Sequence, residues 1–522
     1  MKRFFTYLML MCPFGLFAQG EMDALKMGET DILGTARYMS MGGAFGALGG
    51  DASSIGVNPA GLGIYRKSEI SFTPSVMVNR NESETPGATT DDHRSTFNVN
   101  NFSTVFNFKG GGDVMKYSSF AFSYNRRTNF RRNMNAFYKD SPASISDYMT
   151  LRTNELGIRR ADIGNKDYIF SGDIPYISDL AWQAYMIDPI EDSDDCKQYK
   201  SFLNPGELTT ANVWSKEKGG VNQFDFAYGG NIKDIVFFGA SLGIYNINYR
   251  MESYYDEAYE SGGYFRLKNT LRTYGCGVDF KFGTIVAPVD FLRLGFSFHT
   301  PTWFFLNDEA KFSADYDTGE NRTGHIGTIR SAAEYDYRSP YSLVGSLAFV
   351  IGQKAIISAD YEMSDYAKME FDTPDDDRDY YHSSPDLYWK ENELISKDFK
   401  KKHTLRVGAE YRVTKDWSIR LGYAYSTSPV KDALENDLDD SGERANVIYT
   451  AGTTPAYSIP QDNMTYSGGF GYHKSFFFVD FAYALNLQKE NYYMFFDKSN
   501  LMSPVKLTSK RHFAVCTLGF KF

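Results

Sequence analysis

From residue 68 to the end of the chain, apolar and polar residues alternate with a period of two. In the first such segment, Ile70, Phe72 and Val76 share one face, and Ser71 and Thr73 share the other. This period is that of a β-strand with one apolar and one polar face. The same pattern marks strands at 97–108, 118–129, 223–228, 234–251, 265–282, 291–301, 341–351, 355–366, 403–413, 417–426, 464–472, 475–486 and 510–522. We therefore predict an all-β chain of about fourteen strands.

Short and long connections alternate between these strands. The long connections carry runs of charge, and the short ones include 109–113, 229–231, 352–354, 414–416 and 473–474. Such alternation is typical of a transmembrane antiparallel β-barrel, in which periplasmic turns are short and extracellular loops are long. An even number of strands returns the chain to the periplasm, so every short connection falls on one side of the membrane. We assign residues 67–522 to this barrel.

The composition supports a membrane barrel. Aromatic residues make up 16% of the 522 residues, with 38 Tyr and 42 Phe, and charged residues make up 23%. A barrel places aromatic side chains in girdles at both membrane–water boundaries and polar side chains in its lumen. The formal net charge of −10 disfavours a nucleic-acid partner. The acidic loop runs at 375–379 and 435–440 are expected to be solvated or to bind a divalent cation.

Residues 1–18 have the three parts of a secretory signal peptide. Lys2 and Arg3 come first, an apolar run follows, and Ala18 stands at the cleavage position. We expect the mature chain to begin near Gln19. No later apolar run reaches the roughly 18 residues that a transmembrane helix needs. An exported chain of this kind is therefore either a secreted protein or a barrel.

Residues 34–62 form a glycine- and alanine-rich stretch whose only charges are Arg37 and Asp51. Small side chains bury little area and each glycine adds ordering entropy, so this stretch cannot build a core of its own. We interpret residues 19–66 as a plug inside the barrel lumen, and call this segment the hatch. Its glycines suit turns with positive φ and close contact with the barrel wall.

A long extracellular insert, residues 130–222, follows the third strand. It contains two helix-like stretches, at 144–156 and 174–187. The second gathers apolar residues on one face at three- and four-residue spacing; these are Ile174, Ile177, Leu180, Tyr185 and Ile187. Two interpretations stay open. The helix packs on the rim of its own barrel, or its apolar face is a capture surface for a hydrophobic substrate.

The alternation of the third strand falters at Asn125, Arg126 and Arg127, where two cations adjoin. We take this point as the candidate kink or bulge of a lateral gate; the alternative is that the strand leaves the membrane there. Together with Arg131 and Arg132, the two arginines form a basic group in an acidic protein. Such a group attracts either a fatty-acid carboxylate or anionic lipopolysaccharide, and the sequence does not choose between them.

The last strand ends in an alternating aromatic pattern. Leu518, Phe520 and Phe522 fall on one face, and the chain stops on Phe522. This ending resembles the signal that outer-membrane barrels present to the barrel-assembly machinery. The alternative is an ordinary edge strand.

Two local motifs carry a resemblance to a known family. One motif lies at 459–472 and contains I-P, D-N, S-G-G and G-Y in that order. The other lies in the hatch, with Gly34, Arg37, Ser40, Gly42, Gly43, Asp51, Asn58, Pro59, Ala60 and Leu62 in order. With the strands and the terminal phenylalanine, they resemble the FadL-like family of outer-membrane transporters for long-chain fatty acids and other hydrophobic compounds.

This resemblance implies a fourteen-stranded barrel that the hatch blocks. It implies capture of a hydrophobic small molecule or fatty acid at the extracellular loops, passage to an apolar lumen pocket, and lateral release beside a kinked third strand. Asn58, Pro59 and Ala60 would then set the hatch against the wall near that strand. The setting it implies is the outer membrane of a Gram-negative bacterium, with lipid and lipopolysaccharide around the barrel. We expect a monomer.

Other functions compete with transport. The seven histidines are scattered with no nucleophile motif beside them, so we expect no enzyme. No H-x-x-x-H or C-x-x-C pair occurs, so we expect no metal site and no cofactor. A diffusion porin for polar solutes needs an open constriction lined with charge, whereas the hatch is expected to fill the lumen. A surface receptor or adhesin would instead use the long loops to bind a macromolecule.

Overall fold

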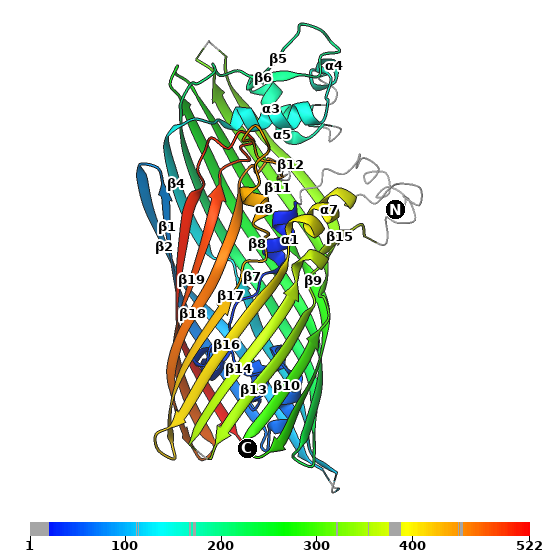
Figure 1. Cartoon of the computed structure of the whole chain (residues 1–522), viewed down its shortest axis with the longest axis vertical. Helices are drawn as coiled ribbons and strands as arrows, with labels where there is room; N and C mark the ends of the chain where they lie inside the picture. Colours follow the sequence, from blue (N-terminus) through cyan, green and yellow to red (C-terminus); the bar gives the residue numbers. More distant parts are fainter. Residues whose placement is uncertain are drawn as a thin grey trace, which may run out of the picture.

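The computed structural model describes residues 20–110, 112, 114–165, 169–170, 174–319, 322–352, 354–374, 388–446, 448 and 453–522. Its strands form a closed antiparallel barrel whose long axis is vertical in Figure 1. The sheet has 18 strand segments but 14 barrel strands, because four of the strands are interrupted. The prediction of an all-β antiparallel barrel of about fourteen strands is confirmed.

The barrel closes where the first and last strands meet. Glu69 pairs with Lys521, and the pairing continues to Glu84 opposite Lys506. In chain order, the barrel strands are β1 (Glu69–Thr85), β2 (Ala88–Lys109), β3 (Met115–Asn129) continued by β4 (Arg132–Ser141), β7 (Thr209–Ile232), β8 (Val236–Tyr259), β9 (Tyr264–Val289), β10 (Leu292–His299) continued by β11 (Trp303–Asp317), β12 (Thr323–Arg338) continued by β13 (Ser342–Ile351), β14 (Ala355–Asp365) continued by β15 (Glu370–Asp372), β16 (Lys401–Arg412), β17 (Trp417–Ser426), β18 (Tyr457–Lys474), β19 (Phe477–Tyr493) and β20 (Val505–Lys521).

Prolines cause two of the interruptions. Pro301 separates β10 from β11, and Pro340 separates β12 from β13. A proline has no N–H to donate to a ladder of hydrogen bonds. The chain repairs the gap locally, since Thr302 N donates to Ser339 Oγ at 2.8 Å and Ser339 N donates to the Thr302 carbonyl at 3.0 Å.

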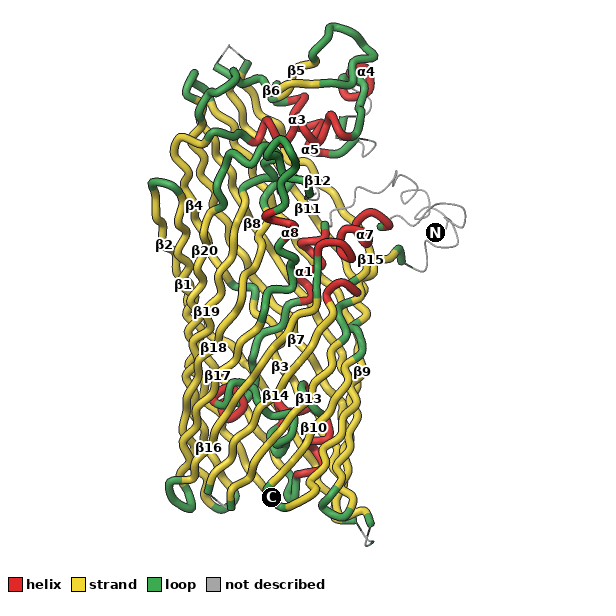
Figure 2. The backbone as a smooth tube through the Cα atoms, in the orientation of Figure 1, coloured by secondary structure: helices red, strands yellow, loops and turns green. Residues whose placement is uncertain are grey.

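The helices lie inside the barrel or at its upper end (Figure 2). No described helix is both long enough and apolar enough to cross a membrane. The hatch contains α1 (Glu21–Gly28), α2 (Ala36–Ser40), η1 (Ala52–Gly56) and η2 (Pro59–Ile64). The insert contains α3 (Ile145–Glu155), α4 (Arg160–Ile163), α5 (Tyr176–Gln183) and the small sheet of β5 (Ile187–Pro189) and β6 (Tyr199–Ser201), and the loops carry η3 (Tyr366–Lys368), α7 (Trp389–Asp398) and α8 (Ala433–Asn436). The two helices predicted in the insert are confirmed as α3 and α5.

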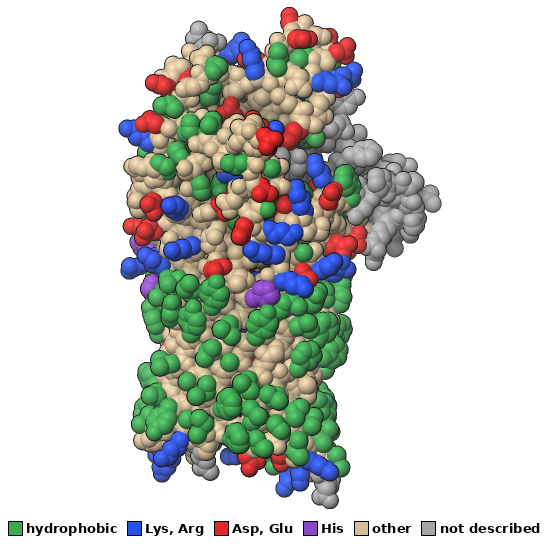
Figure 3. Space-filling model, in the orientation of Figure 1, with side chains coloured by type: hydrophobic (Ala, Val, Ile, Leu, Met, Phe, Trp, Pro, Cys, Tyr) green, Lys and Arg blue, Asp and Glu red, His purple; other side chains and the backbone are tan. Residues whose placement is uncertain are grey.

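On the face shown in Figure 3, a belt of hydrophobic side chains covers the lower half of the outer surface, and charged side chains lie above and below it. Exposed side chains of alternate strand positions build it, including Phe120, Phe226 and Phe282. Large apolar side chains exposed over such an area fit lipid rather than water. The belt therefore marks the membrane-spanning segments, and the barrel continues well above it.

The sequence pattern missed β11 and β12 and placed the start of β7 too late. Below the belt's upper margin the apolar face of each strand points outward, whereas above it the apolar face points inward. In β11, for example, Phe312 and Ala314 are buried while Lys311 is exposed. The insert consequently begins and ends as strand, because Arg132–Ser141 and Thr209 onward belong to the wall.

Candidate transport pathway

The hatch occupies the lumen in two parts. Residues 34–65, the lower hatch, lie in the lower half of the barrel, and α1 lies above them, beside α7 (Figures 1 and 2). Four glycines of the lower hatch, Gly42, Gly43, Gly49 and Gly50, have positive φ between 60° and 77°. A side chain would strain these turns. The expectation that hatch glycines supply such turns is confirmed.

Asn58 joins the lower hatch to the wall through its side chain. Its Nδ2 donates to the carbonyl of Gly46 at 2.7 Å and to that of Thr284 on β9 at 3.1 Å. Its Oδ1 accepts from Ala60 N at 3.0 Å and so caps η2. Pro59 fits here because the first helical position needs no N–H. The Asn-Pro-Ala motif thus begins a short helix and also bonds the hatch to β9 of the barrel.

Three wall glycines stand directly opposite one another where η2 touches the barrel. Gly229 pairs with Gly239, and Gly239 pairs with Gly283. A Cβ at Gly229 would lie 2.6 Å from the Leu62 Cβ, and one at either other glycine would overlap hatch atoms of residues 58–60. The predicted turn at 229–231 is wrong, because these residues lie within β7, where Gly229 contacts the hatch, and the turn lies at 233–235.

An ion-pair chain holds the other side of the lower hatch. Arg37 Nε lies 2.9 Å from Glu410 Oε2, which lies 2.7 Å from Arg420 Nε. Arg420 Nη1 in turn lies 2.6 Å from Asp480 Oδ1. Charges held in a lumen need such partners, since an unpaired buried charge is costly.

The remaining predicted hatch residues serve its internal structure. Asp51 accepts from the Thr35 hydroxyl at 2.8 Å and from Ser53 N at 2.9 Å. Ser40 Oγ donates to the Arg37 carbonyl at 2.9 Å. Gly34 packs against Ser53, and a Cβ at Gly34 would lie 2.5 Å from Ser53 Oγ. The roles of these residues in transport stay predictions.

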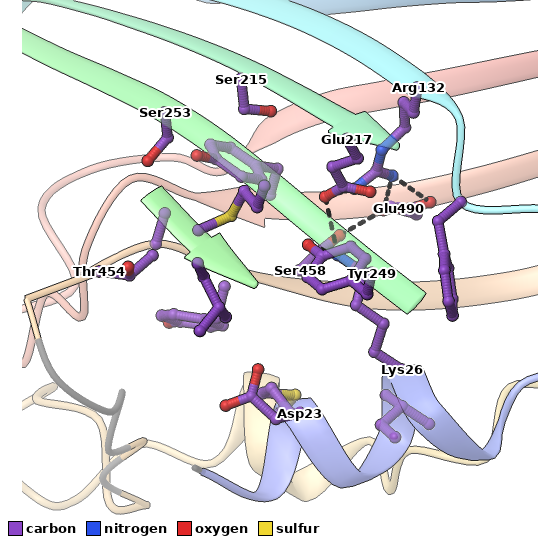
Figure 4. Close-up of a pocket in the computed structure, with 18 of the residues that line it drawn as sticks. Asp23, Lys26, Arg132, Ser215, Glu217, Tyr249, Ser253, Thr454, Ser458 and Glu490 are labelled. Carbon is purple, nitrogen blue, oxygen red and sulfur yellow. Dashed lines mark hydrogen bonds and ion pairs between the residues drawn. The ribbon is translucent and has the colours of Figure 1, made fainter. Parts of the chain in front are cut away.

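A cavity of about 260 Å³ lies in the upper lumen beside α1. Its wall combines apolar side chains, such as Met22, Leu25 and Leu271, with charged ones. Lys26 of α1 lies 2.7 Å from Glu217 of β7 (Figure 4). The cavity is amphipathic, whereas the resemblance implied an apolar pocket.

Arg132 completes this charged network by joining two strands. It lies 3.3 Å from Glu217 and 2.9 Å from Glu490 of β19 (Figure 4). The sequence predicted Arg132 as part of a basic group, but in the structure Glu217 and Glu490 neutralise its charge. No sequence signal reveals this network, because its members lie far apart in the chain.

Glu21 begins α1 and is fully buried. Neither carboxylate oxygen is hydrogen-bonded to another described residue. Burial, with a smaller contribution from the Asp398 carboxylate at the end of α7, raises the pKa of Glu21 from 4.5 to about 8. Glu21 is therefore protonated at neutral pH, which allows α1 to pack against α7.

The ladder between β2 and β3 breaks where the sequence predicted a kink. Asn101 opposite Asn125 is the last pair, and Asn101 Nδ2 donates to Asn125 Oδ1 at 2.7 Å. The pairing of β3 with β7 then shifts between Arg126 and Thr128, which is the mark of a bulge. Asn125, Arg126 and Arg127 lie at this break. Their role as a lateral gate stays a prediction.

Beyond the break, β4 lies on the luminal side of the β1–β2 hairpin. Asn79 and Asn81, both on the inner face of β1, donate to the carbonyls of Arg131 at 3.3 Å and Asn133 at 2.5 Å. In the described part of the chain, no strand pairs with the other edge of β2 over residues 88–100. The wall therefore has a step here, and the cavity borders it through Asn79 and Arg131.

The predicted capture surface is largely buried. The side chains of Ile174, Ile177, Leu180 and Ile187 are at most 6% exposed, whereas Tyr185 is 45% exposed. The four aliphatic residues pack in the large core that joins the insert to the upper barrel. This burial supports the alternative in which α5 packs on its own rim. A part in capture stays a prediction for Tyr185.

The other predicted elements lie at the ends of the barrel. Phe520 and Phe522 are exposed at its lower rim, and Phe522 N donates to the Ser68 carbonyl at 3.0 Å. Their part in assembly stays a prediction. In the acidic run 435–440, Glu435 accepts from Tyr493 Oη at 2.8 Å. The run 375–379 lies outside the described residues, as does the predicted signal peptide.

Known proteins resemble this chain in sequence and in fold. A family model described as outer membrane protein transport protein (OMPP1/FadL/TodX) matches residues 238–522, which is more than half of the chain. A FadL homologue of Pseudomonas aeruginosa superposes with a TM-score of 0.52 at 12% identity, covering 95% of this chain and 100% of that one. The toluene transporter TodX of Pseudomonas putida gives 0.51 at 11% identity, with 95% and 100% covered. No curated protein matches the chain. These two structures share its fold.

Proposed function

This chain belongs to the outer membrane protein transport family (OMPP1/FadL/TodX), and we propose that it takes up amphiphilic hydrophobic compounds, such as long-chain fatty acids, across the outer membrane. The compound enters from the extracellular loops, rests in the upper cavity, and leaves sideways into the membrane at the break between β2 and β3. The break beside the cavity carries this proposal.

The hatch supports sideways rather than axial release. Its lower part is bonded to β9 through Asn58, to β16 through Arg37 and to β14 through Gly46, whose N–H donates to Asp360 at 2.9 Å. A solute moving along the axis would have to break contacts on several sides of the lumen. Leaving through the wall breaks none of them.

Apolar contact for the acyl tail is the physical advantage of leaving through the wall. Each CH₂ of an acyl chain that enters water costs about 0.8 kcal/mol. The cavity offers Met22, Leu25 and Leu271 to the chain and borders the step in the wall. The acyl tail on this route passes from these apolar side chains to the bilayer, while its polar end passes the polar step.

The protein acts in the outer membrane. A signal peptide at 1–18, removed before the mature chain folds, delivers it to the outer membrane, where the barrel-assembly machinery reads Phe520 and Phe522. Outer-membrane lipid and lipopolysaccharide surround the apolar belt. The protein acts as a monomer without catalysis.

A crosslink across the break tests sideways release. Asn129 Nδ2 donates to Asn98 Oδ1 at 3.3 Å, so cysteines at these positions would face each other from β3 and β2. The native cysteines Cys196, Cys276 and Cys516 are first replaced by serine. A short thiol-reactive crosslinker should then abolish uptake of labelled oleate by cells.

A matched crosslink serves as control. Asn107 and Ser119 pair within the intact part of the same ladder, where Asn107 Nδ2 donates to Ser119 Oγ at 2.8 Å. Cysteines there should crosslink without slowing uptake. If oleate uptake survives the 98–129 crosslink, or falls equally with both, release beside β3 is wrong.

A further inference from the structure

Three arginines line the step between the cavity and the break. Arg94 lies on the inner face of β2, directly opposite Asn79 of β1. Arg131 lies between β3 and β4, and its carbonyl accepts from the same Asn79. Arg126 lies at the bulge of β3, where its Nη1 donates to Asn98 Oδ1 of β2 at 3.1 Å. The three residues thus lie around one place on three segments of the chain, and we call them the arginine triad.

The arginine triad has only neutral partners. Arg94 Nη1 donates to Asn133 Oδ1 at 3.2 Å and to the Glu217 carbonyl at 3.0 Å. The Nε of Arg126 is buried without a hydrogen-bond partner among the described residues. No described carboxylate lies within ion-pair distance of any member of the triad. Each guanidinium therefore keeps N–H groups for a further acceptor.

Mutual repulsion acts within the arginine triad. All three side chains are half-buried. Burial and the charges of Arg126 and Arg94 together lower the pKa of Arg131. Like charges brought together in a partly desolvated place destabilise the fold unless an anion joins them.

Three other luminal cations of this chain are paired with carboxylates. Arg132 and Lys26 bind Glu217 and Glu490, and Arg511 lies 2.7 Å from Asp31. The arginine triad differs from these three cations, since no described carboxylate pairs with it. The difference occurs where the proposed route leaves the cavity, which points to a ligand that brings its own negative charge.

We propose that Arg94, Arg126 and Arg131 bind the carboxylate of the transported amphiphile as it passes from the cavity to the break. The inference rests on the proposed function and narrows its cargo to anionic amphiphiles. Arg131 lines the cavity, so it meets the headgroup first. Arg94 and Arg126 stand on the two strands that separate, and a guanidinium fork matches a carboxylate in geometry.

Ligand binding to the full chain in detergent tests the triad. Oleate and oleyl alcohol share one acyl chain and differ in headgroup charge. The variants Arg126→Gln and Arg131→Gln should weaken oleate binding about tenfold or more and leave oleyl alcohol within about twofold. Arg126→Lys keeps the charge and should retain most of the oleate affinity.

A surface arginine provides the matched control. Arg80 lies on β1 beside Asn79 but is exposed on the outer face, so Arg80→Gln should change neither affinity. Equal loss of oleate and oleyl alcohol in the triad variants would show a structural role and overturn the assignment. Unchanged oleate binding would overturn it as well.

Lipid phosphate is the competing anion, because the break faces the membrane. The phosphate of co-purified lipopolysaccharide is measured in the same variants. If bound phosphate falls while oleate binding stays constant, the triad is a lipid site and the cargo assignment is wrong. A wild-type protein that binds neither oleate nor oleyl alcohol would overturn the transport proposal itself. Wild-type binding of both, unchanged in the variants, would overturn only the triad.

Discussion

Asn58 of the hatch lies against Gly283 of β9 so closely that a methyl group on Gly283 would overlap its Oδ1. The same Asn58 side chain bonds to the carbonyl of the next residue, Thr284. A contact of this kind joins hatch and wall without a gap. It also means that a change in the wall alone can displace the hatch.

We expect Gly283→Val to loosen the lower hatch. The valine side chain needs the space of Asn58 and Pro59, and the rigid wall leaves the hatch as the part that moves. Single-channel conductance in planar bilayers should rise clearly above that of the wild type. Gly345→Val is the control, because nothing lies within 4 Å of a Cβ at Gly345. Equal conductance of the two variants would contradict the close contact of the wall glycines with the hatch.

Deletion of residues 19–65 separates a transporter from a porin. The intact protein should be nearly closed in planar bilayers, because the lower hatch is bonded around the lumen, and the deletion should open it. A diffusion porin would conduct freely when intact. A surface receptor would show no uptake defect after the deletion.

Replacement of Asn58 and Pro59 by alanine should impair uptake more than barrel assembly. The variant loses the bonds to Gly46 and Thr284 and the cap of η2, each of which contributes about 1 kcal/mol. Barrel assembly depends on strand pairing elsewhere and should continue. Labelled oleate uptake and the heat-dependent gel mobility of the folded barrel measure the two properties. Equal losses would show that the motif is only structural.

The packing of α1 should depend on pH through Glu21. The pKa of Glu21 in the folded protein, about 8, lies above its ordinary value of 4.5. Its contribution to stability is therefore complete below pH 4.5 and is lost as pH rises through about 8. Amide hydrogen exchange of residues 21–28, corrected for intrinsic rates, should accelerate as pH rises from about 4.5 to about 8 and level off above that pH.

Glu21→Gln provides the control for this pH dependence. The neutral amide matches the protonated carboxyl in shape and cannot ionise. Exchange of α1 in this variant should stay constant across the same pH range. An unchanged pH dependence would assign the effect to another group.

Much of the barrel was predictable from the sequence because lipid imposes a simple rule on each strand. Within the belt, outward positions such as Phe120 and Phe226 are apolar and inward positions are small or polar. Above the belt the rule reverses, and β11 and β12 were missed for that reason. The turn prediction at Gly229 and Gly230 was wrong because a glycine that allows close contact with another backbone cannot be distinguished in the sequence from a turn glycine.

The candidate site was predictable only where it is local. Irregular alternation pointed to Asn125, Arg126 and Arg127 because a bulge disturbs its own strand. The arginine triad and the Lys26–Glu217 pair join distant segments, and no periodicity records such contacts. Arg94, in particular, lies in a strand with ordinary alternation. Only its contact with Asn133 of β4 shows that it belongs to the site.

The unpaired edge of β2 determines how far into the membrane the gap in the barrel wall can extend. Its unpaired N–H and C=O groups need water or lipid headgroups, because hydrocarbon cannot solvate them. Phe97 is the outward aromatic residue of the unpaired stretch, and the outward residues above it are Ser95, His93 and Asp91. The edge is therefore wet over most of its length. A molecule leaving here would arrive with its polar end among the lipid headgroups and its tail directed into the bilayer, the orientation that it keeps afterwards.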